Sequence, residues 1–324
     1  MPFVTGEETR ASVPQAASAA PQSLGSRILN SDLWYSFKRS PVTVISAVVT
    51  LLLILSALAA PLIAPQNPFD PINISIMDSF YPPAWEERGD PRFLLGTDDQ
   101  GRDVLSTILY GMRISLAVGF ASVVFAMMLG ITLGLVAGYA GGRTDSIIMR
   151  VADVQLTFPA ILIALLIDGV ARAMAGPRSY DSIVFYVLVL SIGLSFWVQY
   201  ARTVRGSVLV EKNKEYVMAA RLIGLRPLAI MFKHILPNVL GPVMVIATIN
   251  LALAIITEAT LSFLGVGVPP TQPSLGTLIR IGNDFLFSGE WWITIFPGIT
   301  LAILALAVNL LGDWLRDALN PKLQ

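Results

Sequence analysis

The chain has 324 residues, of which 54% are hydrophobic and only 14% are charged. Soluble domains are roughly 25% charged, so this composition predicts an integral membrane protein. The sequence has no cysteine and a single histidine, His234, which excludes disulfides, thiolate chemistry and a histidine metal cluster. A formal net charge of zero gives no electrostatic reason to bind nucleic acid. These absences exclude most enzyme chemistries, and we predict neither a catalytic residue nor a metal site.

The first 60 residues predict a tail and a membrane span. Residues 1–30 are rich in Ala, Ser, Pro and Gln without apolar periodicity, which is typical of a disordered cytoplasmic tail. Residues 41–60 carry no charge, and about 20 apolar residues can cross the hydrocarbon core. This run is too long for a signal peptide, and no small-residue cleavage site follows it. Lys38 and Arg39 directly before it are expected to hold the N-terminus inside.

Five further segments bring the predicted total to six spans. Residues 114–140, 182–200 and 291–311 are charge-free, and residues 234–257 remain so until Glu258. Residues 147–170 are the weakest candidate, because they carry Arg150, Asp153 and Asp168. Arg150 and Asp153 lie three residues apart on a predicted helix, so we expect them to form an ion pair rather than to gate a pathway.

The distribution of basic residues predicts the orientation. With six spans, 15 Lys and Arg residues fall on the side of the two termini and 7 on the other side. Cytoplasmic segments of membrane proteins are enriched in Lys and Arg. Both termini are therefore predicted to be cytoplasmic, and the long segment after the first span is predicted to lie outside.

A ladder of small residues marks the second predicted span. Its members, each four residues after the last, are Ser122, Ala126, Gly130, Gly134 and Gly138. This spacing puts a smooth ridge on one helix face and allows another helix to approach closely in lipid. We favour packing inside the subunit over packing across a dimer.

The segment 61–113 before this span is rich in Pro and acidic residues and ends in LGTDDQGRDVLS at residues 95–106. Asp98, Asp99 and Asp103 cluster there, but their spacing does not match a calcium-binding EF-hand loop. We expect this segment to be an outer surface and not a metal site.

A polar stretch between the fourth and fifth spans predicts a docking element. Tyr216, Ala219, Ala220 and Ile223 follow the i, i+3, i+4, i+7 spacing of one apolar helix face. Gly224 stands where a helix C-terminal glycine belongs, and Pro227 in the following residues suits a first helical turn. A short helix–turn–helix outside the bilayer with a small-residue face predicts entry into a groove of another protein.

These residues resemble the signature loop of permease subunits of binding-protein-dependent ABC importers. The resemblance rests on Ala219-Ala220, Gly224 and Leu236-Pro237; the one departure is Met218, where the general signature has Glu. Residues 95–106 and the YGMRISL stretch at 110–116 together resemble the hallmark of the dipeptide, oligopeptide and nickel permease group. Further motifs agree in order over about residues 30–324: GGRTD at 141–145, MRVAD at 149–153, LSFLGVG at 261–267 and NLLGDWLRDALNPK at 309–322.

The resemblance implies an all-α integral membrane protein with six transmembrane helices and the type I importer permease (MetI-like) fold. It implies a tail (1–30), a first span with an extracytoplasmic segment (31–112), and a five-helix core (113–324) with a cytoplasmic coupling loop at 205–237. The implied coupling residues are Glu215, Tyr216, Ala219, Ala220, Arg221, Ile223, Gly224, Leu236 and Pro237.

The resemblance also implies partners in a bacterial inner membrane: a second homologous permease, two ABC ATPase subunits and an extracytoplasmic solute-binding protein. No G-x-x-x-x-G-K-S/T phosphate loop occurs in the sequence, so ATP and Mg are expected on the ATPase subunits and no cofactor on this chain. The expected cargo is a di- or oligopeptide. The same fold importing nickel or glutathione is an alternative, and a self-contained secondary transporter is a more distant one.

Glu258 is the candidate for a residue of the outer gate. It ends the charge-free run of the fifth span, and about 20 residues at 1.5 Å each place it near the outer boundary of the hydrocarbon core. An ionisable group at that depth faces a bundle interior or a wet cavity by default. A carboxylate exposed to headgroups, or one that caps the next short helix, is the equal alternative.

The absence of cysteine allows the orientation to be tested directly. Asn213→Cys is expected to react with a membrane-impermeant maleimide only from the cytoplasmic side, and Ser79→Cys only from outside, because the predicted topology separates them. The measurement is labelling of intact cells before and after permeabilisation. The reverse pattern at either position would overturn the topology.

Overall fold

The structure is a computed structural model that describes residues 37–70, 72 and 74–318. The chain divides into two units, Met1–Ser40 and Pro41–Gln324. The predicted tail at residues 1–30 lies outside the described residues. The division into segments 31–112 and 113–324 stays a prediction, and one helix runs through residue 112 without interruption.

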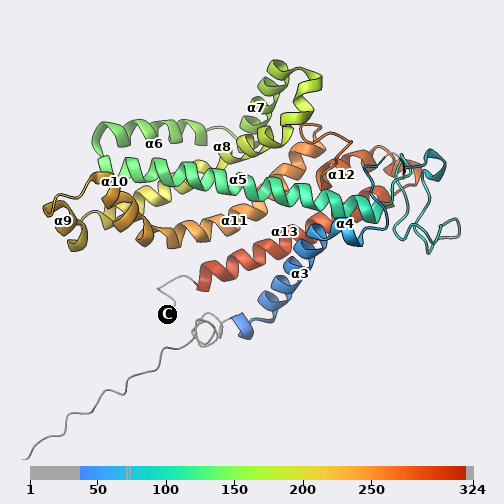
Figure 1. The fold of residues 1–324 in the computed structure, drawn as a ribbon, viewed down its shortest axis with the longest axis horizontal. Helices are drawn as coiled ribbons and strands as arrows, with labels where there is room; N and C mark the ends of the chain where they lie inside the picture. Colours follow the sequence, from blue (N-terminus) through green and yellow to red (C-terminus); the bar gives the residue numbers. More distant parts are fainter. Residues whose placement is uncertain (1–36, 71, 73, 319–324) are drawn as a thin grey trace, which may run out of the picture. The chain divides into compact units, whose positions relative to one another are not determined.

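Five helices of the described part are long and apolar enough to cross a membrane. They are α3 (Pro41–Leu58), α5 (Val104–Ala140), α8 (Pro177–Glu211), α11 (Leu236–Phe263) and α13 (Trp292–Ala318), and Figure 1 shows them. Each contains most or all of one predicted charge-free run, and this run supplies the apolar surface that lipid requires. The predicted all-α membrane fold is confirmed.

The sixth predicted span is not one straight helix. Residues 147–170 are divided between α6 (Gly142–Leu156) and α7 (Ala160–Ala175), which are bent by 95° and count as a sixth span only when taken together. The break falls at Pro159, which has no backbone N–H and disfavours helical geometry in Phe158 before it. The predicted ion pair is also wrong in its partner, because Asp153 pairs with Arg202 of α8 and not with Arg150.

The small-residue ridge of α5 packs against α8, so the prediction that it packs within the subunit is confirmed. A Cβ atom built on Gly130 would lie 2.4 Å from Tyr200 Cβ, and one built on Gly134 would lie 2.6 Å from the Ala201 carbonyl oxygen. At Gly138 the distance to Val208 Cβ would be 2.7 Å. Side chains at these positions would push the two helices apart, so glycine sets how closely they approach.

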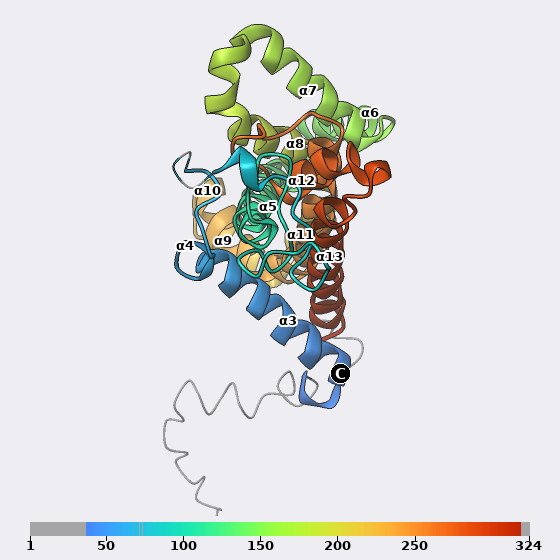
Figure 2. The ribbon, with the colours of Figure 1, turned by 90° about the vertical axis from the view of Figure 1, so that its right-hand side faces the viewer.

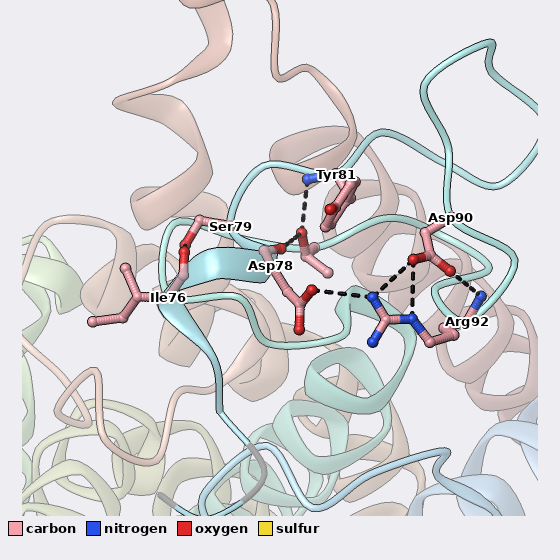
Figure 3. A network of polar contacts seen from close by, with 7 residues as sticks. Ile76, Asp78, Ser79, Tyr81, Asp90 and Arg92 are labelled. Atoms are coloured by element: carbon pink, nitrogen blue, oxygen red, sulfur yellow. Dashed lines mark hydrogen bonds and ion pairs between the residues drawn. The ribbon is translucent and has the colours of Figure 1, made fainter.

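The segment between α3 and α5 contains α4 (Ala60–Ile63), the short helix η2 (Ile76–Asp78) and loops. Figure 3 shows how it is fixed: the Arg92 guanidinium bridges Asp78 at 3.1 Å and Asp90 at 2.8 Å. Arg92 lowers the pKa of the Asp90 carboxyl through these hydrogen bonds. The Thr97 hydroxyl donates to the Asp78 carbonyl oxygen at 2.6 Å. These contacts hold η2 against the chain that enters α5.

Acidic residues at the start of α5 bind to groups of the same chain. Asp98 pairs with the buried Arg102 at 2.6 Å, and Asp103 caps α5 by accepting from the Ser106 backbone N–H at 2.7 Å. Burial raises the pKa of the Asp103 carboxyl. An ion pair and a helix cap therefore account for two of the three predicted acidic residues.

The two ends of α5 adjoin different structures. At one end lie the segment before α5, α12 (Leu275–Asn283) and η4 (Leu286–Ser288). At the other end lie α9 (Glu215–Leu222), α10 (Pro227–Ala229) and the π-helix η3 (Ile230–Ile235). Figure 2 looks along the molecule from the first of these ends, with α4 and α12 toward the viewer.

The helix contact predicts a matched pair of substitutions. Gly134→Ala is expected to destabilise the protein by about 1–3 kcal/mol, because the new methyl group overlaps α8. Gly206→Ala, on α8 with no atom within 4 Å of the new Cβ, is expected to be neutral or slightly stabilising. Reversible unfolding in mixed micelles measures both. Equal effects of the two changes would contradict the packing assignment.

Candidate functional site

The predicted docking element is a short helix closed by a glycine turn. Gly224 has a φ of 77°, as its predicted role required. The Leu225 N–H donates to the Ala220 carbonyl at 3.1 Å, and the Gly224 N–H donates to the Arg221 carbonyl at 3.0 Å. This pair of bonds is the Schellman motif, in which a left-handed glycine ends a helix. A residue with a Cβ is strained at such a φ, so the turn depends on Gly224.

The predicted apolar stripe is split between two faces of α9. Ala220 is buried together with Val217 in a core cluster that includes Ile230 and Ile235. The interpretation that Ala220 is small because it presses against another protein is therefore corrected: in this structure it packs against its own chain. Tyr216, Ala219 and Ile223 are exposed as expected.

The exposed surface of this element is more apolar than the sequence pattern indicated. Leu222, the last residue of α9, is 88% exposed, and Ile223, its C-cap, is 75% exposed. Met218, Leu228 and Phe232 are exposed as well. Leu222 and Leu228 were missed in the sequence analysis. Large apolar residues beside a turn glycine, outside the membrane spans, are a signal for an interaction surface that could have found them. We call Met218, Leu222, Ile223 and Leu228 the docking face.

Tyr216 ties this element to two membrane helices. Its hydroxyl donates to Glu211 at the end of α8 at 2.5 Å and accepts from the Asn238 amide of α11 at 3.2 Å. Partial burial and the bond to Glu211 raise the pKa of Tyr216 to about 12. Lys214 adds an ion pair to Glu211 at 2.6 Å.

Two further contacts reach the end of α5. Lys212 Nζ donates to the Gly138 carbonyl at 2.8 Å, and the Arg221 guanidinium lies 5.1 Å from the centre of the Tyr139 ring. The element is thus attached to the ends of α5, α8 and α11. A force applied to the docking face would reach all three helices.

The junction with α11 is unusual in its backbone. Pro237 stands in the first turn of α11 and cannot donate a backbone hydrogen bond to the turn before it. The wider π-turn of η3, closed by the Leu236 N–H bonding to the Met231 carbonyl, precedes this proline. Leu236 is half-buried against the core and Pro237 is exposed. Glu215, in the first turn of α9, is exposed.

Glu258 lies far from the docking element, and its side chain is fully buried. It accepts from the Ser262 hydroxyl at 2.7 Å, and the hydroxyls of Ser115 on α5 and Ser274 before α12 lie close enough to interact with it. Ser274 caps α12, and the Leu275 N–H donates to Ser115 at 3.2 Å. Of the predicted alternatives, exposure to headgroups does not occur in this structure. Glu258 sits where α5, α11 and α12 meet.

Comparison with protein families assigns the class. Residues 130–324 match the family described as the binding-protein-dependent transport system inner membrane component. Residues 29–83 match the N-terminal transmembrane domain of oligopeptide transport permease C. The chain belongs to the binding-protein-dependent inner membrane component family.

Individual relatives align over most of the chain. It is 39% identical over 293 residues to a di/tripeptide transport system permease protein of Pseudomonas aeruginosa, covering 90% of this chain and 92% of that protein. It is 40% identical to a dipeptide transport system permease protein of Haemophilus influenzae, over 90% and 95% of the two chains. Identity to the Escherichia coli K12 dipeptide permease protein is 41%, over 90% and 93%.

The fold is similar to solved structures of the methionine ABC transporter MetNI in inward-facing conformations. One aligns with a TM-score of 0.51 at 21% sequence identity, over 67% of this chain and 97% of that chain. Another aligns with a TM-score of 0.50 at 20% identity, over 66% and 96%. At this identity the similarity establishes the fold alone.

Proposed function

We propose that this chain is a permease subunit of an ATP-driven importer of di- or oligopeptides and forms half of the translocation pathway. The names of its relatives and its membership of the family support the class of cargo. The observation that carries the mechanism is the docking face, which is apolar, exposed and fixed to three membrane helices.

In this proposal the docking face binds an ABC ATPase subunit. The sequence has no phosphate loop of its own, so the energy of ATP hydrolysis has to enter through a contact with another protein. Movement of the ATPase pushes α9, and the contacts of Tyr216, Lys212 and Arg221 pass the displacement to α8, α11 and α5. Discrete rearrangement of packed helices is how such local shifts become large ones.

The remaining partners follow from the same proposal. A second homologous permease completes the pathway, and two ATPase subunits bind on the cytoplasmic side. An extracytoplasmic binding protein delivers the solute to the opposite end of α5. Selection among dipeptides, oligopeptides, nickel and glutathione then rests largely on the binding protein.

Ile223→Asp tests the docking face. A charge in the centre of an apolar contact is expected to reduce retention of the ATPase subunits at least about tenfold, because the carboxylate loses water without gaining a partner. Ile76→Asp is the matched control, since Ile76 is 81% exposed and Ile223 75% exposed. The two lie near opposite ends of α5, because the segment of Ile76 is bonded to Asp99 just before α5 and the segment before α9 is bonded to Gly138 in its last turn. The measurement is the amount of ATPase that copurifies with the permease in detergent. Unchanged retention in Ile223→Asp, or equal loss in both variants, would refute the proposal.

We also propose that Glu258 belongs to the outer gate. Its place at the junction of α5, α11 and α12 supports this. To open the pathway at the end of the unit where α5 begins, these three helices have to move apart or move together as one body.

Glu258→Gln is expected to lower solute uptake several-fold, since the amide replaces a group that can be charged when the junction opens. Assembly and basal ATP hydrolysis are expected to persist, because glutamine keeps the acceptor for Ser262. Uptake into proteoliposomes with saturating binding protein is the measurement. Unchanged uptake for several solutes and pH values would leave Glu258 with a structural role only.

A further inference from the structure

Two adjoining cavities meet at Arg113 on α5. The first has a volume of about 340 Å³, and Tyr110, Gln272 and Phe185 are among its lining residues. The second has a volume of about 360 Å³ and is lined by α3, α5 and α11. Arg113 and Ala117 line both cavities. The positively charged Arg113 side chain therefore borders both cavities.

Arg113 differs from Arg92 and Arg102, two other arginines at this end of α5. Arg92 and Arg102 each pair with aspartate. Arg113 makes no ion pair with a carboxylate in the part of the chain that the structure describes, and its guanidinium lies 6.0 Å from the centre of the Tyr110 ring. The side chain is exposed. It is a cation available to an anionic group from outside the chain.

The second cavity is apolar apart from Arg113. Its other lining residues are Ile54, Ala57, Leu58, Leu116, Ala117, Phe120 and Leu251. A peptide there would leave its backbone amides without hydrogen-bond partners, which is costly, whereas a hydrocarbon chain would not. Phe120 is 63% exposed and Leu58 66% exposed, so the lining continues into surface that faces lipid.

The depth of the cavity also fits a lipid. Arg113 directly precedes the charge-free run that begins at residue 114, so it lies near the boundary of the hydrocarbon core. From Arg113 to Phe120 the helix advances seven residues, or about 10 Å, which is roughly two-thirds of one leaflet. The cation thus stands at headgroup depth and the apolar lining extends toward the bilayer centre.

We propose that these cavities bind a glycerophospholipid of the leaflet on the side of residues 61–103. The phosphate pairs with the Arg113 guanidinium. The headgroup lies in the first cavity, where the Tyr110 hydroxyl and the Gln272 amide are further hydrogen-bonding groups. One acyl chain lies between α3, α5 and α11 against Leu116, Phe120 and Leu251. The bound lipid fills the space between α3 and the rest of the bundle.

The test is native mass spectrometry of the purified full-length chain, titrated in non-ionic detergent with 1-palmitoyl-2-oleoyl-phosphatidylglycerol. Arg113→Gln is expected to weaken binding at one saturable site at least about tenfold, the loss expected when a charge-assisted contact is removed. Arg113→Lys is expected to retain most of the binding. Ala117→Phe, which keeps the charge but fills the shared wall, is expected to weaken binding as well.

Arg88→Gln is the matched control, because it removes the same charge from an exposed position that lines neither cavity. The diacylglycerol with the same chains lacks the phosphate and is expected to bind weakly. Binding by Arg113→Gln equal to the wild type, or equal loss in Arg88→Gln, would overturn the proposal. Loss of the lipid when the second permease is bound would assign the cavities to that subunit and would overturn it too.

Discussion

The close contact of α5 with α8 is the constraint on which the rest of the unit depends. Gly130, Gly134 and Gly138 let the two backbones approach, and both helices are far longer than a bilayer requires. α5 has 37 residues, which is about 55 Å of helix against a hydrocarbon core of about 30 Å. It is therefore longer than the hydrocarbon core is thick. At its first turn α5 is capped by Asp103 of the preceding segment, and at its last turn the Gly138 carbonyl accepts a hydrogen bond from Lys212, next to the docking element. One rigid helix pair consequently links the two surfaces at which partners are expected.

The end of the unit at which α5 begins is held by arginines that pair with nearby aspartates. Arg102 pairs with Asp98 and donates to the Pro270 carbonyl at 3.0 Å, while Arg172 pairs with Asp168 and donates to the Gly265 carbonyl at 3.2 Å. Both carbonyls belong to the loop between α11 and α12. The loop is thus tied to the start of α5 on one side and to α7 on the other. Because hydrogen bonds from a charged donor are stronger than neutral ones, this loop, the start of α5 and α7 are expected to move together rather than separately.

The sequence predicted the spans well because lipid imposes one strong rule on composition. It predicted the helix ends poorly for the same reason. Residues 182–200 were assigned to a span, yet α8 runs from Pro177 to Glu211, since a helix can continue into water where charges are allowed. The bend at Pro159 had a local signal, but the pairing of Asp153 with Arg202 depends on how α6 packs against α8. The periodicity of α9 likewise predicts which residues share a helix face, but not which face packs against the rest of the chain. The assignment of Ala220 to the partner-binding face is therefore wrong.

Arg113 and Glu258 show why burial, rather than position in the sequence, separates such residues. Each stands at an end of a charge-free run, so their positions in the sequence do not distinguish the two residues. Ser115 follows Arg113 by two residues, so the two side chains leave α5 on nearly opposite sides. Ser115 points to the junction that encloses Glu258, and Arg113 points to the lipid-facing side. A long arginine side chain can keep its charge at the membrane boundary, whereas the shorter Glu258 side chain is enclosed and accepts a hydrogen bond from the Ser262 hydroxyl. On the same turn of α5, Ser115 therefore contacts the junction with α11 and α12, and Arg113 faces the proposed lipid site.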